Sequence, residues 1–289
     1  MDRNRCPLCE GRTLKPGRAG LMICSDCGLA AACPLPMPEE LSRLYTREYY
    51  EAWGARGGED SEVMAMKQAT FTPRLNRVKP IRKGARILDV GCATGFFLTL
   101  VEAEGGEAHG VEISPYAAGE ARKRWGGRVR EGTLVEAGYS SEYFFAVFMS
   151  DLIEHVLRPA DLLEETFRIL EPGGWVVVCT PDFGGLSARL LGKHWFHKKQ
   201  EHILYFTRAS LRKALAMAGF QDIRMETGVK AMTIHYLASQ FRTYSLFPVT
   251  QALNLMERVL PESFSHHVFS LPSGEVVAFA RKPQGSPSS

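Results

Sequence analysis

The chain has 289 residues, 45% of them hydrophobic and 23% charged, which is typical of a soluble globular protein with one large domain and an appendage. Its net charge of +3 at pH 7 is too small to indicate a nucleic-acid groove, which argues against a nucleic-acid partner. The longest apolar run, Tyr143–Met149, is too short to cross a bilayer and the first 25 residues hold no signal-type run, so we expect a cytoplasmic protein without stable membrane association.

Residues 1–33 contain two pairs of cysteines, in CPLCEG and CSDCG, at the spacing C-x2-C-x14-C-x2-C. Each C-x2-C pair can turn two thiolates toward one ion, and four thiolates complete the tetrahedral shell of zinc. The expected ligands are Cys6, Cys9, Cys24 and Cys27. Because four thiolates leave no open coordination position, the pattern predicts a structural zinc ribbon, with a reduced or redox-active set of thiols as the alternative.

Residues 34–80 begin Pro-rich and then follow a helical pattern, with a helix expected over Val63–Val78 and a loop before it at Gly54–Asp60. A dense group of aromatic residues precedes the loop: Tyr45, Tyr49, Tyr50 and Trp53. These side chains either pack against the core of the next domain or form a flap over a ligand pocket.

Residues 81–282 alternate between strand and helix patterns, which predicts an open, doubly wound α/β sheet. Ile87–Val90 is a short buried strand, Gly91–Gly95 is a tight turn, and Phe96 begins a helix. Further strands are expected at Ala108–Glu112, Val129–Glu131, Phe144–Met149, Trp175–Thr180, Gln221–Glu226 and Glu275–Ala280.

Three other stretches of this region have a less regular pattern. Residues 182–206 are expected to form a loop rich in histidine and aromatic residues, and Thr207 caps a helix that ends at Gly219. Residues 232–262 form an apolar, partly helical insertion, and residues 283–289 read as a disordered tail. The insertion could cover an acceptor pocket, form a face for a homodimer or touch a membrane, in that order of preference.

The glycine turn allows a ligand to lie against the backbone. A dinucleotide fingerprint does not fit, because its last glycine would fall on Phe96. The spacing of Asp89, Gly91, Ala93 and Gly95 instead resembles motif I of class I S-adenosylmethionine-dependent methyltransferases. That cofactor has a net positive charge, which suits an acid before the turn and another at the end of the next strand.

The resemblance continues along the chain and covers roughly residues 6–227, including a subgroup with an N-terminal zinc ribbon. The matching segments are Leu44–Tyr50 (LY-x-x-x-YY), Asp151–Val156 (with EHV), Leu170–Gly174 (L-x-P-G-G), His202–Thr207 and Ala218–Phe220. The resemblance implies a mostly parallel, seven-stranded Rossmann-like sheet, S-adenosylmethionine as the methyl donor and structural Zn²⁺.

The resemblance also implies a set of cofactor-binding residues: Asp89, Gly91, Cys92, Ala93, Gly95, Glu112, Ile113, Thr133, Leu134 and Ser150. Three positions depart from the family pattern. Ala93 replaces the middle glycine, Thr133 stands where an aspartate often contacts adenine, and Phe145 replaces an aspartate at the start of a strand. The adenine contacts are therefore the least defined part of the expected site.

Methyl transfer requires alignment of donor and acceptor and, for many acceptors, removal of a proton. His155 is the first candidate for a general base and His202 the second, with Tyr205 as an orienter; each histidine could instead be structural. We expect a small-molecule acceptor such as a sugar, polyketide or quinone. An RNA methyltransferase is an alternative, but no Asn-Pro-Pro-Tyr-type segment follows the fourth strand and basic residues do not cluster near the expected mouth of the site. A cofactor-binding scaffold without catalysis is a further alternative.

Overall fold

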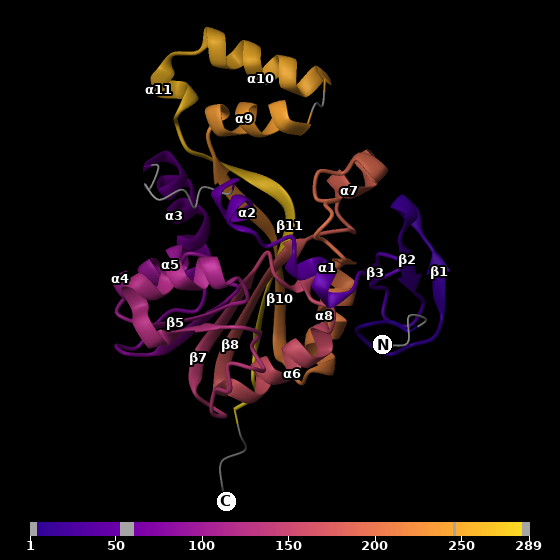
Figure 1. The fold of residues 1–289 in the computed structure, drawn as a ribbon, viewed down its shortest axis with the longest axis vertical. Coiled ribbons are helices and arrows are strands. Elements are labelled where there is room, and N and C mark those ends of the chain that lie inside the picture. Colours follow the sequence, from indigo (N-terminus) through magenta and orange to yellow (C-terminus); the bar gives the residue numbers. More distant parts are fainter. Residues whose placement is uncertain (1–4, 53–60, 245–246, 285–289) are drawn as a thin grey trace, which may run out of the picture.

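The computed structural model describes residues 5–52, 61–244 and 247–284, and it is built around a seven-stranded sheet (Figure 1). The strand order is β10-β11-β8-β7-β4-β5-β6, and the pairs from β8 to β6 are parallel while β11 is antiparallel to both neighbours. The bounds are β4 (Arg86–Val90), β5 (Glu107–Glu112), β6 (Val129–Glu131), β7 (Phe144–Ser150), β8 (Leu170–Pro181), β10 (Gln221–Met232) and β11 (Phe269–Arg281). The predicted doubly wound, mostly parallel sheet is confirmed.

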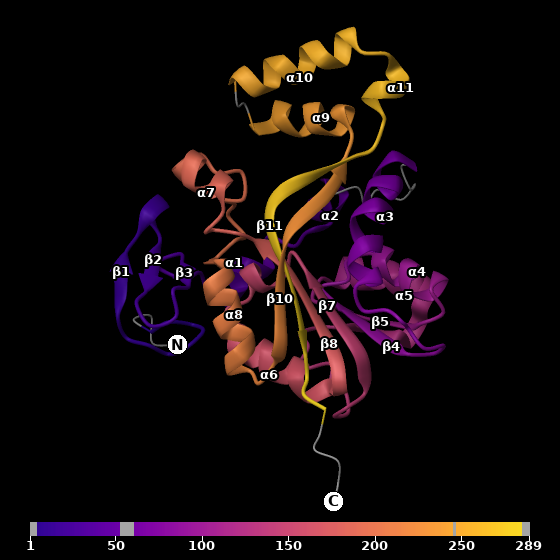
Figure 2. The same cartoon turned by 180° about the vertical axis from the view of Figure 1, so that it is seen from behind.

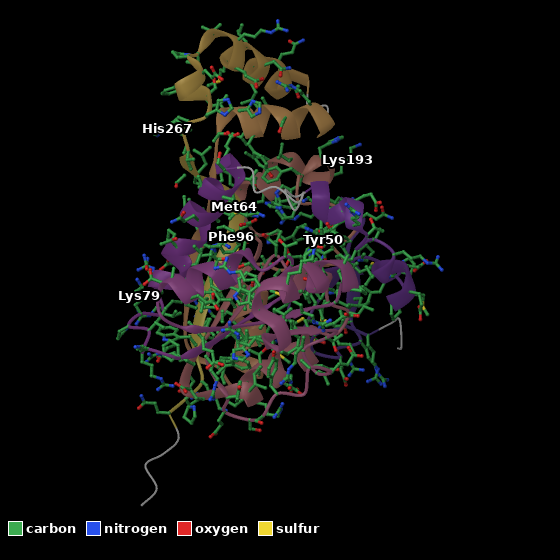
Figure 3. The ribbon with its side chains drawn as sticks, turned by 60° about the vertical axis from the view of Figure 1, so that its left-hand side comes forward. Tyr50, Met64, Lys79, Phe96, Lys193 and His267 are labelled. Carbon is green, nitrogen blue, oxygen red and sulfur yellow. The ribbon has the colours of Figure 1, made fainter. Side chains whose placement is uncertain are left out.

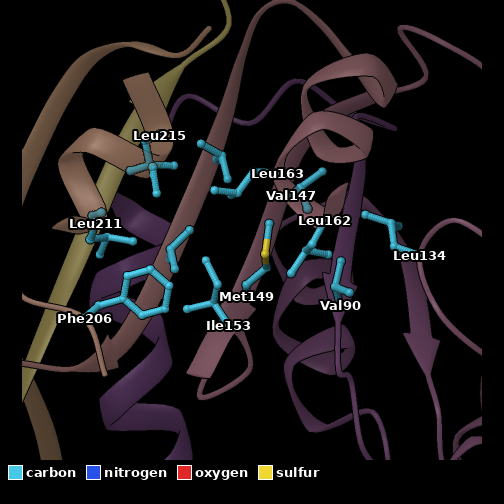
Figure 4. Close-up of a cluster of buried hydrophobic side chains, with 14 of the residues drawn as sticks. Val90, Leu134, Val147, Met149, Ile153, Leu162, Leu163, Phe206, Leu211 and Leu215 are labelled. Carbon is cyan, nitrogen blue, oxygen red and sulfur yellow. The ribbon is translucent and has the colours of Figure 1, made fainter. Parts of the chain in front are cut away.

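Helices cover both faces of this sheet (Figures 1 and 2). One core cluster joins the sheet to α3 (Ser61–Asn76), α4 (Phe96–Ala103) and α5 (Pro115–Trp125). The other joins it to α6 (Pro159–Ile169) and α8 (Arg208–Met217). Figure 4 shows the second cluster, where side chains of β7, α6 and α8 meet. Because both faces of β7 are covered, its sequence is almost continuously apolar.

The predicted helix boundaries follow their capping residues. Ser114 accepts from the backbone N–H of Ala117 at 3.5 Å, and Pro115 occupies the first turn of α5. Thr207 accepts from the N–H of Ser210 at 3.1 Å at the start of α8. Short polar side chains and proline are therefore sufficient to place these helix starts.

Three strand predictions were too short. β8 begins at Leu170, so the Pro-Gly-Gly segment before Trp175 lies inside the strand, where the register against β7 shifts. β10 and β11 are also longer than predicted. Their antiparallel pairing continues as far as the pair Met232–Phe269, past the last pair of β11 with β8. Residues 182–206 are also not a plain loop, since they contain α7 (Leu186–Leu191) and β9 (Leu204–Tyr205).

A second, four-stranded sheet has the strand order β1 (Leu14–Pro16), β2 (Met22–Cys24), β3 (Ala30–Ala31) and β9, and Cys24 is the one paired cysteine that lies on a strand of it. β9 comes from the larger domain, and its residues pair with Ala30 and Ala31. The cysteine-bearing segment is therefore joined to the larger domain by main-chain pairing. The predicted division into residues 1–33, 34–80 and 81–282 stays a prediction.

The remaining helices are α1 (Pro38–Ser42), α2 (Arg47–Ala52), α9 (Ile234–Tyr244), α10 (Phe247–Val259) and α11 (Glu262–Ser265). The last three form the predicted helical insertion, which stands beyond the end of the sheet (Figure 2). None of the helices in the described ranges is long and apolar enough to span a bilayer. Trp53, the predicted loop at 54–60 and most of the predicted tail, residues 285–289, lie outside the described residues.

Candidate functional site

Glu112 lies at the carboxyl end of β5 and is 3% exposed. Its Oε2 accepts a hydrogen bond from the N–H of Ala93, and its Oε1 accepts from the N–H of Ser114 and the hydroxyl of Tyr50, each at 2.9 Å. A carboxylate has about four acceptor positions. Two main-chain donors thus orient Glu112, and of the two positions left Tyr50, on α2 (Figure 3), uses one.

Asp89 is buried on the neighbouring strand β4. Burial, and then the negative charge of Glu112, hold the pKa of its carboxyl well above the usual range. Two buried acids side by side favour a ligand that brings positive charge. The edge formed by Asp89 and Glu112 is therefore suited to a cation.

The turn between β4 and α4 requires glycine at position 95 more strictly than at position 91. Gly95 has φ +87°, and a Cβ there would lie 2.4 Å from Cζ3 of Trp125. Gly91 has φ +77° and is open except for the side chain of Leu152. Ala93 adopts φ +48°, so its methyl group is accommodated at some strain. Gly91 and Ala93 are partly exposed in this turn, whereas Cys92 and Gly95 are buried.

The other residues expected to contact the cofactor lie in different surroundings. The Cys92 side chain packs in the core beneath Gly110, and Leu134 is buried, whereas Ile113 is half exposed. The Thr133 hydroxyl and N–H both donate to Glu136 at 2.8 Å. Contacts of these residues with a cofactor, and of Ser150 at the end of β7, stay predictions.

A polar group lies at the carboxyl end of β7, next to the glycine turn. Glu154 Oε2 accepts from the Thr180 hydroxyl at 2.9 Å, whereas its Oε1 is buried and has no hydrogen-bond partner among the described residues. The Nε2 of His155 is 4.0 Å from that Oε1. His202 joins them, and its buried Nδ1 also has no hydrogen-bond partner in the described part of the chain. The structure thus brings both predicted histidines to one point.

Burial sets the charge of this group. It lowers the pKa of His155 to about 4 and that of His202 to about 2, so both rings are neutral near pH 7. Burial, and then the charge of Asp151, raise the pKa of Glu154 to about 8. The three ligand atoms lie within 4.8 Å of one another. Two neutral imidazoles and a carboxyl could bind a hydroxyl group, and they are also the donor set of a divalent transition metal.

Tyr205 is placed elsewhere. It lies on β9, and its ring packs with Phe183 and Trp195 in a separate apolar cluster. Burial raises the pKa of its hydroxyl to about 12. The structure therefore does not bring Tyr205 into the Glu154, His155 and His202 group as an orienter.

A cluster of charges beside this group was not predicted from the sequence. Lys230 Nζ lies 3.1 Å from Asp151 and 2.5 Å from Glu275, and Arg74 Nη2 lies 3.7 Å from Glu275. Asp151 directly follows β7 and adopts φ +53°. Lys230 lies in the part of β10 beyond the predicted strand Gln221–Glu226, whereas Glu275 is the first residue of the predicted strand Glu275–Ala280.

The four N-terminal thiols converge as the spacing predicts. Cys6 Sγ is 3.5 Å from Cys27 Sγ, and Cys9 Sγ is 3.6 Å from Cys24 Sγ, with all four within 4.8 Å. Thiolates at about 2.3 Å from a tetrahedral ion lie about 3.8 Å apart, so the geometry fits one zinc ion. The four sulfur atoms already surround the position of such an ion, so the ion fits without a rearrangement of the segment.

Comparison with known proteins agrees with this geometry. A family model described as a methyltransferase domain matches residues 65–224, more than half of the chain. Ubiquinone biosynthesis O-methyltransferase of Thiobacillus denitrificans is 31% identical over 126 residues, which is 38% of this chain and 54% of that protein. The Burkholderia thailandensis protein of the same name is 22% identical over 205 residues, 60% of this chain and 82% of that protein. The chain thus spans about half the length of the first relative.

Solved structures share the fold. A methyltransferase of Thermotoga maritima, described as a possible histamine N-methyltransferase, has a TM-score of 0.55 at 22% identity and covers 85% of this chain and 100% of that one. A SAM-dependent methyltransferase of Archaeoglobus fulgidus has a TM-score of 0.53 at 20% identity, covering 76% of this chain and 94% of that one. At these identities the likeness shows the fold alone.

Proposed function

The chain belongs to the family of methyltransferase domains, and from this membership we propose that it transfers the methyl group of S-adenosylmethionine to a hydroxyl group of a small molecule. The observation that supports a hydroxyl acceptor is the buried group of Glu154, His155 and His202, in which two polar atoms have no partner among the described residues. The relatives named O-methyltransferases support an oxygen acceptor as well.

The cofactor would be held at the carboxyl ends of β4 and β5. When bound, S-adenosylmethionine supplies a methyl group already activated on a sulfonium. Glu112 offers the ribose hydroxyls its free acceptor position and the one that Tyr50 occupies, and the negative charge of Glu112 favours the net positive ligand. Gly91 and Gly95 keep the turn narrow enough for close approach.

The acceptor hydroxyl would lie at the carboxyl end of β7. A neutral His155 can take its proton on Nε2, since burial lowers the pKa of this ring and leaves one nitrogen with a free lone pair at pH 7. Glu154 Oε1 lies beside that nitrogen, and His202 supplies a second hydrogen-bonding atom. These groups orient the acceptor and exclude water from it, because all three are largely buried.

The first test compares three histidine variants. We expect His155→Ala and His202→Ala to reduce turnover of hydroxylated acceptors, His155→Ala by about 100-fold or more, with S-adenosylmethionine binding retained in calorimetry. His194→Ala, an exposed histidine of the neighbouring segment, is the matched control and should keep full activity. Normal turnover in both test variants would contradict the assigned roles. Cofactor binding without turnover over a broad acceptor panel would instead indicate a non-catalytic scaffold.

We also propose that Cys6, Cys9, Cys24 and Cys27 hold one structural zinc ion within residues 1–33, as in the zinc-ribbon subgroup. The short sulfur–sulfur distances support this assignment. A cytoplasmic location is part of the same proposal, because reduced thiols are the form that binds zinc.

A further inference from the structure

We propose that Tyr45 is a positioning residue for His155, which it holds in the tautomer that leaves Nε2 free to act as a base. The Tyr45 hydroxyl oxygen lies 3.1 Å from Nδ1 of His155, across 110 positions of sequence. The two rings also meet edge to face, with centroids 6.2 Å apart. This inference rests on the proposed function, because it concerns the proposed base.

The backbone of Tyr45 is fixed from the cofactor side. The Ser114 hydroxyl donates to the carbonyl of Tyr45 at 3.3 Å, and the N–H of Ser114 donates to Glu112 at 2.9 Å. The Tyr45 ring is supported by Tyr49, whose ring lies edge-on at 5.5 Å. Tyr45 therefore spans the site from the end of β5 to the end of β7 and is held at both ends.

The state of both groups follows from their burial. A neutral imidazole carries one N–H, and its position is set by the hydrogen bond of the other nitrogen. Burial raises the pKa of the Tyr45 hydroxyl, so Tyr45 remains a neutral partner and cannot act as a charged carboxylate would. The contact fits either tautomer, and the proposed one carries the proton on Nδ1, which donates to the Tyr45 oxygen. The lone pair of Nε2 then points toward the side where Glu154 Oε1 lies at 4.0 Å.

The same hydrogen bond also serves the charged state of His155. When the acceptor O–H bond breaks, its electron pair stays on the acceptor oxygen and its proton moves to Nε2. The resulting imidazolium keeps its Nδ1–H bond to the Tyr45 oxygen, so the ring does not have to turn during proton transfer. Tyr45 does not touch the acceptor in this arrangement and acts through His155.

The test uses Tyr45→Phe, with Tyr139→Phe as the matched control. Tyr139 is also a buried tyrosine, and its hydroxyl has no hydrogen-bond partner among the described residues. We expect Tyr45→Phe to lower kcat by about 10- to 100-fold, because the imidazole is less well oriented, with the KM of both substrates changed by less than about 2-fold. Tyr139→Phe should leave kcat unchanged. Thermal melting checks that both variants are folded.

Nitrogen NMR of ¹⁵N-histidine-labelled protein supplies a readout independent of turnover. In the unsubstituted protein we expect His155, assigned with His155→Ala, to be the Nδ1–H tautomer, and in Tyr45→Phe a mixture of both tautomers. An Nε2–H tautomer in the unsubstituted protein, or unchanged kcat and tautomer in Tyr45→Phe, would overturn the proposal. Failure of the proposed function looks different: the unsubstituted protein would methylate no acceptor, while the NMR result would still decide the role of Tyr45.

Discussion

At the scale of residues, the hydrogen bonds of Glu112 determine how many acceptor positions are open to a ligand. Backbone N–H groups of Ala93 and Ser114 fix its carboxylate, and the Tyr50 hydroxyl takes one of the two acceptor positions left. Two ribose hydroxyls need both of these positions. If Glu112 binds both ribose hydroxyls, as proposed, Tyr50 has to release Glu112 before the cofactor can be fully bound.

Replacing Tyr50 by Phe should accordingly strengthen cofactor binding. A net hydrogen bond of about 1 kcal/mol no longer has to be exchanged, which corresponds to an affinity for S-adenosylmethionine roughly 5-fold higher. Calorimetry measures this change, with Tyr139→Phe as the control for loss of a buried tyrosine hydroxyl. Weaker binding in Tyr50→Phe would mean that the Tyr50 hydroxyl holds the cofactor and does not compete with it.

Site residues can be predicted from the sequence when they belong to one short motif with a fixed spacing. Asp89, the glycine turn and the paired cysteines lie at fixed local spacings, so the chemistry can be inferred without a fold. The contact between Tyr45 and His155 joins positions 110 apart, and neither residue has a local signal for the other. Such contacts depend on how segments pack, which no spacing rule specifies.

At the scale of elements, the cysteine-bearing segment pairs with the stretch of chain that directly follows His202, which belongs to the proposed acceptor site. β9 continues the sheet of this segment, and β9 begins two residues after His202. The N–H of Ala32 also donates to the carbonyl of Ile203 at 2.9 Å. The sequence indicated a separate appended ribbon, because two-residue strands such as β3 and β9 have too little pattern to be predicted.

Loss of the metal site should therefore affect turnover before cofactor binding. In Cys24→Ser we expect zinc content to fall from about one ion per chain and kcat to fall about 10-fold or more, since the segment that holds His202 loses its support. The affinity for S-adenosylmethionine should change little. Asp89 lies on β4 and Glu112 on β5, and neither strand pairs with the sheet of the cysteine-bearing segment.

The exposed Cys33 supplies the matched control for this change. Cys33→Ser removes a thiol from the same region without touching the four-sulfur group, so zinc content and turnover should both stay normal. Full turnover in a zinc-free Cys24→Ser protein would show that β9 needs no support from the ribbon.

At the scale of the whole molecule, strand order explains why the two halves of the site meet. β4 pairs with β5 on one side and β7 on the other, so the cofactor acids and the acceptor group lie at one edge on opposite sides of the glycine turn. The alternating pattern predicted this sheet. The extension of β10 that contributes Lys230 was missed, whereas Glu275 is the first residue of the predicted strand Glu275–Ala280.

Cofactor binding should stabilise the entire larger domain, because the ligand contacts strands at its centre. At a concentration 100 times Kd, binding adds about 2.7 kcal/mol to the free energy of unfolding, which raises Tm by roughly 5–10 °C in a domain of this size. Differential scanning fluorimetry measures this shift with S-adenosylmethionine. Glu112→Gln, which weakens the ribose contact, should show a clearly smaller shift at the same concentration, and an equal shift would exclude Glu112 from the binding site.

The pairing of β3 with β9 has a consequence for biosynthesis. Ala31 and Leu204 are 173 positions apart, so at 5–20 residues per second the ribosome needs about 10–35 s to deliver the partner strand. During that interval a zinc-loaded ribbon can already be folded, while the edge of β3 has no strand to pair with and can join other chains. The four-stranded sheet is therefore completed only after Leu204 and Tyr205 have been synthesised.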